Sequence, residues 1–183
     1  MAHAGIDAIR SMLADSGLGE STIAEQRESM AAVATMPPPA GTTATPDSVG
    51  GRPAEWLLPA GVEDRSPVLL YLHGGGYCIG SLGTHRNLAG LLALASGLAV
   101  CNLDYRLAPE HPFPAAVDDA LAAYRDLLDR GTDPSVIAIG GDSAGGGLTV
   151  ALLVAARDAG LPLPALGVCL SPWTDLTQSV PAR

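Results

Sequence analysis

The sequence predicts an α/β fold with a mostly parallel sheet and helices on both faces. Short apolar runs alternate with amphipathic segments of about 10–15 residues through most of the chain, which is typical of repeated βαβ units. Two of the apolar runs end at glycine clusters, one beginning at His73 and the other at Gly140. Because ligands bind at the carboxyl ends of the strands in such sheets, these clusters mark the expected functional site.

Residues 1–45 are expected to form short N-terminal helices and a linker, and residues 46–183 the α/β domain. Apolar side chains recur at helical spacing over residues 6–36, and Gly17 and Gly19 divide this segment into two helices. Three successive prolines at 37–39 end helical structure, because proline lacks an amide donor. We expect a linker or loop from there to about Gly51.

The remaining elements follow from apolar periodicity. The helix at 114–128 has Val117, Leu121 and Leu128 on one face, and Gly131 lies just past its end as a stop signal. The run at 136–139 is apolar throughout, as expected for a strand buried on both faces. In all, strands are expected at residues 55–58, 68–72, 98–103, 136–139 and 166–170, and helices at 88–95, 114–128 and 148–159.

Composition argues against several classes of function. Of the 183 residues 48% are hydrophobic, which is enough for a sizeable core. The net charge of −9, from 10 basic and 19 acidic residues, argues against a nucleic-acid partner, which needs clustered cations. No apolar stretch approaches the roughly 20 residues that span a bilayer, and residues 1–10 lack a signal-peptide pattern. We therefore expect no membrane span and a cytoplasmic location.

Cys78, Cys101 and Cys169 are expected to be buried thiols. Their number is odd, they show no CxxC or CxxH spacing, and two of them lie in predicted strands. A disulfide framework or a zinc site would need more ligands at closer spacing, so neither is expected.

Ser143 is the candidate nucleophile. It lies in the sequence GDSAG at 141–145, between a predicted strand and a predicted helix, where flanking glycines suit a turn in which a Cβ would clash. The amide of Ala144 at the helix N-terminus is then one donor for an oxyanion. Backbone amides after His73 supply the second set, since glycines let them approach a substrate carbonyl closely. The two motifs, about 70 residues apart, together predict a serine hydrolase.

These motifs resemble the hormone-sensitive-lipase-like branch of the α/β-hydrolase fold, the bacterial esterases with a GDSAG signature. The resemblance covers roughly residues 54–178 and rests on YLHGGGY at 71–77, DYRLAPEHPFPAA at 104–116, GGDSAGG at 140–146 and SPWTDL at 171–176. It implies that the N-terminal helices belong to a cap, that Ser143 is the nucleophile, and that the oxyanion donors are the amides of Gly75, Gly76 and Ala144. It also implies hydrolysis of short- to medium-chain carboxylic esters through an acyl-enzyme, without metal or cofactor.

The triad of this family is completed by an acid and then a histidine, yet no histidine follows Ser143 here. Asp158 is expected at the surface, and Asp175 matches a motif position other than the triad acid. His73 is expected to orient the oxyanion loop. None of the four histidines is expected to be the base: His3, His73, His85 and His111.

We therefore expect the chain to be the N-terminal part of a longer enzyme, with the sheet incomplete beyond the strand at 166–170. Three interpretations stay open: an ester hydrolase, a catalytically weak or inactive homologue that acts as a binding protein, and one half of a split enzyme. Besides a small-molecule ester, the expected partner is a second copy of the chain or a complementing C-terminal segment.

Overall fold

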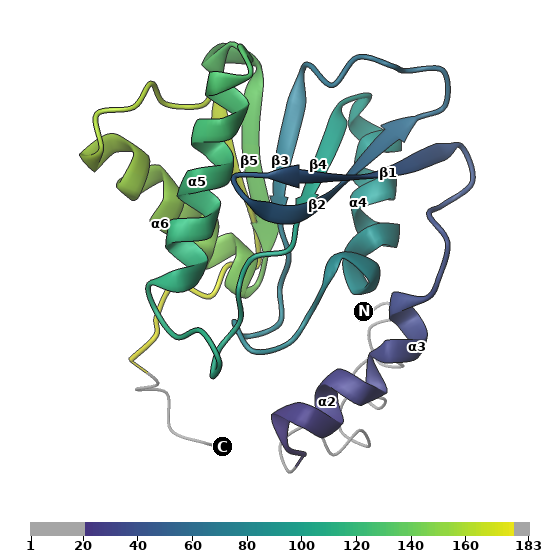
Figure 1. Cartoon of the computed structure of the whole chain (residues 1–183), viewed down its shortest axis with the longest axis vertical. Coiled ribbons are helices and arrows are strands. Elements are labelled where there is room, and N and C mark those ends of the chain that lie inside the picture. The colour runs from purple at the N-terminus through teal and green to yellow at the C-terminus, as the bar shows by residue number, and fades with distance from the viewer. Residues whose placement is uncertain (1–20, 178–183) are drawn as a thin grey trace, which may run out of the picture.

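Residues 21–177 are described by the computed structural model, and they build a six-stranded sheet with helices on both faces (Figure 1). None of the helices in this part of the chain is long and apolar enough to cross a membrane. The strands are β1 (Thr42–Val49), β2 (Arg52–Pro59), β3 (Val68–Leu72), β4 (Ala99–Leu103), β5 (Ile137–Asp142) and β6 (Leu166–Leu170). The helices are α2 (Ile23–Ser29), α3 (Ala31–Ala34), α4 (Leu82–Ser96), α5 (Ala115–Asp129) and α6 (Ala144–Asp158), with a 3-10 turn at Pro134–Val136.

The strand order is β1-β2-β4-β3-β5-β6. Strands β4, β3, β5 and β6 pair in parallel, whereas β1 and β2 add an antiparallel hairpin at one edge. In this register Leu72, the last residue of β3, lies opposite Leu103 on β4 and Gly141 on β5. The carboxyl ends of three parallel strands therefore meet, and the prediction of a mostly parallel sheet is confirmed.

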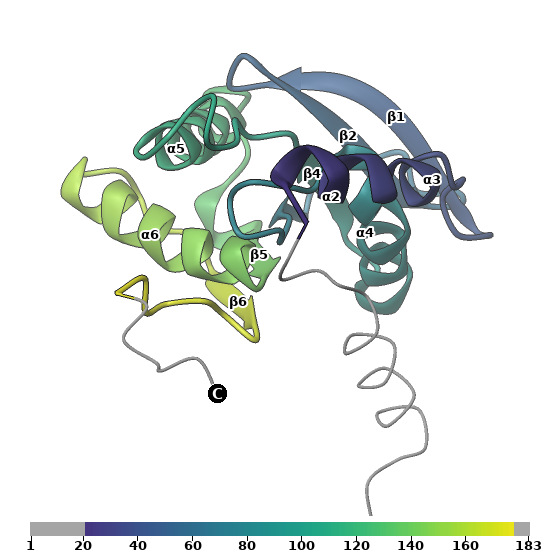
Figure 2. The same ribbon diagram turned by 90° about the horizontal axis from the view of Figure 1, so that it is seen from below.

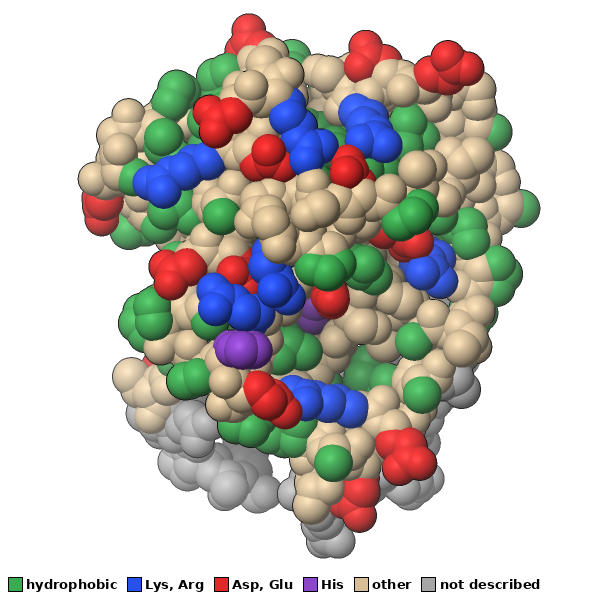
Figure 3. All heavy atoms as spheres, viewed as in Figure 1, with side chains coloured by type: hydrophobic (Ala, Val, Ile, Leu, Met, Phe, Trp, Pro, Cys, Tyr) green, Lys and Arg blue, Asp and Glu red, His purple; other side chains and the backbone are tan. Residues whose placement is uncertain are grey.

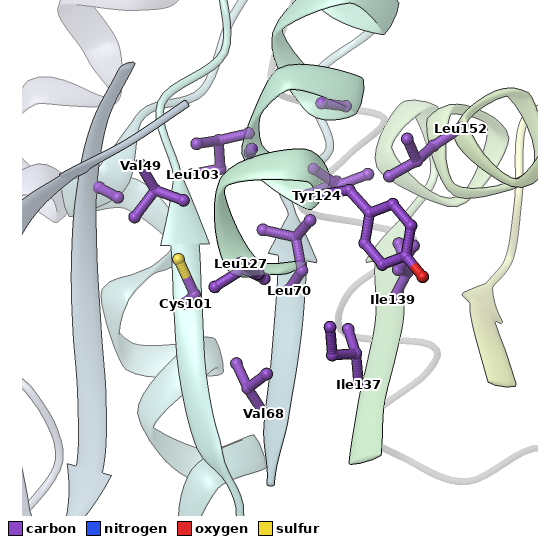
Figure 4. Close-up of a cluster of buried hydrophobic side chains, with 14 of the residues drawn as sticks. Val49, Val68, Leu70, Cys101, Leu103, Tyr124, Leu127, Ile137, Ile139 and Leu152 are labelled. Atoms are coloured by element: carbon purple, nitrogen blue, oxygen red, sulfur yellow. The ribbon is translucent and has the colours of Figure 1, made fainter. Parts of the chain in front are cut away.

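Alternate side chains of β3 pack under different helices. Leu70 belongs to the larger core cluster, whereas Leu69 and Tyr71 belong to the cluster that includes α4. Figure 4 shows the larger cluster, in which Leu127 of α5 and Leu152 of α6 pack with side chains from β3, β4 and β5. Helices thus cover both faces of the sheet, as predicted.

Two short helices precede the sheet. α2 begins with a capping box, in which the Thr22 hydroxyl accepts a hydrogen bond from the Glu25 amide and the Glu25 carboxylate accepts one from the Thr22 amide. Arg27 of α2 donates to the carbonyls of Cys78 and Ala108, in the loops that follow β3 and β4, so α2 lies over the carboxyl ends of these strands (Figure 2). The part of the predicted helical segment before residue 21 lies outside the described residues.

The linker predicted from residue 37 to about Gly51 is wrong over most of its length, because residues 42–49 form strand β1. β1 pairs with β2 through a turn at Gly50 and Gly51, whose φ angles of 59° and 75° suit a two-residue hairpin. The predicted boundary between residues 45 and 46 falls inside β1, and the division into two parts stays a prediction.

The cysteines differ in exposure. Cys101 is buried in the core, Cys78 is half-buried and Cys169 is exposed. The expectation of a buried thiol is therefore wrong for Cys169. Its strand, β6, pairs only with β5 in the described part of the chain, and all five of its residues are exposed.

Candidate active site

Ser143 stands in a strained turn between β5 and α6. Its backbone angles are φ 52° and ψ −116°, a conformation that is rare for a residue with a Cβ, and the residue is exposed. The turn is pressed against the end of β3, because a Cβ on Gly141 or on Gly145 would overlap the Leu72 carbonyl oxygen. Both flanking glycines are therefore needed for this turn.

Glycines in the first turn of α6 let the chain after β6 approach it closely. A Cβ on Gly147 would overlap the carbonyl oxygen of Trp173. The Ser143 amide donates to the Leu170 carbonyl at 2.9 Å, and the Trp173 amide donates to the Ser143 carbonyl at 2.8 Å. A helical glycine costs about 1 kcal/mol relative to alanine, so this close approach outweighs helix propensity. The turn that holds Ser143, called the nucleophile turn because Ser143 is the predicted nucleophile, is thus fixed to the segment that follows β6.

Residues 73–80, called the oxyanion loop because they hold predicted oxyanion donors, follow β3 and lie beside this turn. Gly75 and Gly76 have positive φ angles of 122° and 59°, and the amides of Cys78 and Ile79 donate to the Gly75 carbonyl at 3.0 and 2.9 Å. Within residues 21–177, the amides of Gly75, Gly76 and Ala144 donate no hydrogen bond. These three amides are therefore available to an incoming oxygen.

Asp142 connects the oxyanion loop to the nucleophile turn. Its Oδ1 accepts hydrogen bonds from the Tyr71 hydroxyl at 2.6 Å and from the Gly74 amide at 2.9 Å, and His85 Nε2 lies 3.8 Å away. Burial acts to raise the pKa of Asp142, but the interactions with His85, Tyr71 and the Gly74 amide outweigh it and hold the pKa at about 2. The carboxylate is therefore ionised at neutral pH.

His73 is a buried, neutral anchor for the same loop. Its Nδ1 lies 2.7 Å from the Gly74 carbonyl oxygen, and because a carbonyl only accepts, Nδ1 carries the proton. Its own carbonyl accepts a hydrogen bond from the Tyr105 hydroxyl at 2.6 Å, and the two rings stack with centroids 4.3 Å apart. Burial lowers the pKa of His73 to about 4. This environment agrees with a role in orienting the loop.

No histidine in the described part of the chain is placed as a base for Ser143, whose hydroxyl forms no hydrogen bond within residues 21–177. His85 Nδ1 lies 2.8 Å from the Thr84 hydroxyl, and its Nε2 faces Asp142. His111 is exposed in the loop after β4. The remaining histidine, at position 3, lies outside the described residues.

The acidic residues after Ser143 are engaged elsewhere. Asp158 is the last residue of α6, roughly 20 Å along the helix from Ser143, and accepts a hydrogen bond from its neighbour Arg157. Asp175 Oδ1 accepts hydrogen bonds from the amide and the hydroxyl of Thr177, at 3.0 and 2.6 Å, in a local turn. Within residues 21–177 no group of three His, Cys, Asp or Glu side chains is placed to hold a metal ion.

An open hollow of about 440 Å³ lies between the N-terminal helices and the loop after β4. Figure 3 shows basic, acidic and histidine side chains gathered around it. Its charged lining includes Arg27 of α2 together with Arg52, Arg106 and Glu110. The sequence predicts no role for Arg27, because its partners are 51 to 83 residues away along the chain.

A smaller cavity of about 190 Å³ has an apolar lining. Tyr77, next to the oxyanion glycines, and Ala151, on α6 two turns beyond Ser143, contribute to it with Val117 of α5 and Leu176. Apolar walls of this kind suit an acyl chain or the alcohol part of an ester.

Comparison with known proteins agrees with this fold. Residues 69–183 match the α/β hydrolase fold family. An acetyl-hydrolase of Streptomyces hygroscopicus is 57% identical over 129 residues, which are 70% of this chain and 42% of that protein. Carboxylesterase NlhH of Mycobacterium tuberculosis is 40% identical over 140 residues, 74% of this chain and 44% of that protein.

A crystal structure of an esterase from the bacterial hormone-sensitive lipase family superposes with a TM-score of 0.86 at 50% identity, covering 96% of this chain and 60% of the esterase. The chain thus spans less than half the length of the two curated relatives. The matched residues include both glycine motifs and the segments around them. The chain belongs to the α/β-hydrolase family, in its hormone-sensitive-lipase branch.

Proposed function

We propose that the chain carries the nucleophile and the oxyanion donors of a carboxylic-ester hydrolase that acts on short- to medium-chain acyl esters. The observation that carries the proposal is Ser143, exposed at φ 52° beside three backbone amides that have no acceptor within residues 21–177. Two relatives are named acetyl-hydrolase and carboxylesterase, which supports an ester as the substrate.

The chemistry is a two-step acyl transfer. Ser143 Oγ attacks the ester carbonyl carbon as a base removes its proton, and the carbonyl oxygen becomes an anion. The amides of Gly75, Gly76 and Ala144 bind that anion, and one such donor typically contributes about 10²–10³ in turnover. The protonated base then gives its proton to the departing alcohol. In the second step the base removes a proton from water, the water attacks the acyl-enzyme, and Ser143 leaves and takes the proton back.

We propose that the base and the acid come from a complementing C-terminal segment. In a serine protease, removing the histidine costs about 10⁶ in turnover, while about 10³–10⁴ over the uncatalysed rate survives through binding and the oxyanion hole. The chain by itself is therefore expected to hydrolyse esters slowly.

A fluorophosphonate probe tests the proposal on the full chain. We expect covalent labelling that maps to the peptide containing Ser143, and its loss in Ser143→Ala. Ser171→Ala is the matched control, because Ser171 is also exposed and has a positive φ of 48°, but lies outside the glycine turn.

The same labelling is then measured with a polypeptide that comprises the part of the Streptomyces acetyl-hydrolase which this chain does not match. Faster labelling in the mixture supports a split site. Two outcomes contradict the proposal and favour a binding protein that has kept the fold. One is equal labelling of the wild type and Ser143→Ala, and the other is no labelling of the wild type either with or without the added segment.

A further inference from the structure

Two successive peptide groups of the oxyanion loop are clamped by side chains. In the first, between residues 73 and 74, the carbonyl of His73 accepts the Tyr105 hydroxyl at 2.6 Å, and the amide of Gly74 donates to Asp142 Oδ1 at 2.9 Å. In the second, between Gly74 and Gly75, the carbonyl of Gly74 accepts from the ring of His73 at 2.7 Å.

This clamp sets the direction of a proposed oxyanion donor. A peptide group is planar and trans, so its N–H points opposite to its C=O. Since the Gly74 carbonyl is turned toward His73, the Gly75 amide of the same peptide points away from His73. The orientation of the peptide between Gly74 and Gly75 depends on the preceding peptide, whose Gly74 amide is hydrogen-bonded to Asp142.

The approach of Asp142 is specific to this pair of residues. A Cβ on Gly74 would overlap the carboxylate, so only glycine at position 74 permits the contact. The same Oδ1 also accepts from Tyr71, which is 1% exposed at the end of β3. Asp142 directly precedes Ser143, so a displacement of the carboxylate would move the loop and the nucleophile relative to each other.

We propose that Asp142 is a positioning residue, which orients the Gly74 and Gly75 peptides so that the oxyanion donors face Ser143. The proposal rests on the proposed function. What the Gly74 amide needs is an acceptor oxygen, which asparagine retains and alanine lacks. Asp142→Asn is therefore expected to preserve most of the loop geometry, and Asp142→Ala to lose it.

The test measures two quantities on the full chain and on Asp142→Asn, Asp142→Ala and Tyr71→Phe. The first is the rate constant for labelling by the fluorophosphonate, whose oxygen occupies the same donors. We expect a decrease of about 100-fold in Asp142→Ala, in line with the loss of one oxyanion donor, and of less than 10-fold in Asp142→Asn and Tyr71→Phe. Asp64→Ala is the control, because its carboxylate accepts the Ser66 amide at 3.0 Å on an exposed loop.

The second quantity is amide hydrogen exchange at Gly74 and Gly75, which requires no reaction at Ser143. We expect the Gly74 amide to lose its protection in Asp142→Ala and to keep it in Tyr71→Phe. If the wild type is labelled neither alone nor with the complementing segment, the proposed function fails and amide exchange alone decides about Asp142. The proposal is overturned if the Gly74 amide of Asp142→Ala exchanges at the wild-type rate. It is also overturned if Asp142→Asn and Asp142→Ala lose labelling equally. Should Asp142→Ala not fold, unprotected Gly74 in Asp142→Asn overturns it as well.

Discussion

Arg27 on α2 and Glu110 in the loop after β4 form a bidentate ion pair, with Nη1 2.7 Å from Oε1 and Nη2 2.9 Å from Oε2. The same guanidinium donates through Nε to the Cys78 carbonyl at 2.8 Å and through Nη2 to the Ala108 carbonyl at 3.0 Å. The hydrogen bond from Arg27 holds the pKa of Glu110 at about 2. One side chain therefore fastens the N-terminal helices to the oxyanion loop and to the loop after β4.

Replacing Arg27 by methionine is expected to release α2 without unfolding the sheet. The ion pair is partly exposed, so solvent screens it, whereas each hydrogen bond to a backbone carbonyl contributes about 1 kcal/mol. We expect amide exchange in Ile23–Ser29 to become at least about 10-fold faster in Arg27→Met and only a few-fold faster in Glu110→Gln. Glu28→Gln, on the same helix, is the control. Identical exchange in Arg27→Met and Glu28→Gln would show that the guanidinium does not hold the helix.

Gly145→Ala is expected to destabilise the protein by more than about 3 kcal/mol. The new Cβ would overlap the Leu72 carbonyl oxygen. The Cβ is bonded directly to the backbone of α6 and the oxygen belongs to the backbone of β3, so neither atom can move aside alone. Gly167→Ala is the matched control, because the one tight contact of its Cβ would be with the end of the flexible Leu153 side chain, at 2.9 Å, and we expect a loss below about 1 kcal/mol. Urea unfolding of both variants measures the difference. Equal stability would mean that α6 does not press against β3 at this point.

The fold was predictable where apolar runs are uninterrupted and less so where glycines occur inside elements. β3 and β6 have the predicted bounds. β5 continues through Gly140 and Gly141 to Asp142, because these residues pair with the end of β3, and α6 starts within a run of glycines. Glycine disfavours both structures, so here tertiary contacts outweigh local propensity. β1 was missed for the same reason, since only its pairing with β2 distinguishes it from a loop.

The site was predictable to the extent that its groups lie in short motifs. Ser143 and its flanking glycines are neighbours in sequence, so their chemistry can be read locally. Asp142 lies in the same motif, but its partners Tyr71 and Gly74 are 71 and 68 residues away. No local pattern shows which loop a carboxylate will contact. The contacts of Arg27 on α2 were not predicted for the same reason.

Protonation of Asp47 is expected to lower the free energy of unfolding in acid. Its Oδ2 accepts hydrogen bonds from Trp56 at 2.9 Å, Arg65 at 2.7 Å and Arg130 at 3.1 Å. Burial acts to raise the pKa of Asp47, but the hydrogen bonds from the Ser48 amide, Arg130 and Trp56 outweigh it and hold the pKa at about 2. Because this pKa lies below the unfolded value of about 3.9, the stabilisation, about 2 kcal/mol, is complete above that pH and is lost as the pH falls toward 2.

Asp47→Asn tests this dependence, because the amide does not titrate. We expect the free energy of unfolding of the variant to lie below that of the wild type near neutral pH, and the difference to shrink between about pH 5 and pH 2. Asp64→Asn, on an exposed loop, is the control. A difference that stays constant over this pH range would show that Asp47 acts by packing alone.

Cys169 is expected to report whether another polypeptide covers β6. Its thiol lies on an exposed strand, and its one hydrogen bond within residues 21–177 is to the Gly146 carbonyl, at 3.6 Å. Cys101, in contrast, is fully buried, and burial raises its pKa to about 12, so little reactive thiolate forms. In the isolated chain we therefore expect an alkylating reagent to modify Cys169 at least about 10-fold faster than Cys101.

A polypeptide that pairs with the edge of β6 is expected to slow the alkylation of Cys169. The exposed Leu166, Val168 and Leu170 offer apolar area and free backbone groups, which is what a further strand or a second copy would cover. A partner seated there shields Cys169 but leaves the half-buried Cys78 as it was, so the ratio of the two alkylation rates measures coverage independently of catalysis. We expect this ratio to fall when the complementing polypeptide is added or when the chain concentration is raised enough to form dimers. If the mixture regains esterase activity while Cys169 stays as reactive as before, the added segment binds elsewhere on the molecule and not along β6.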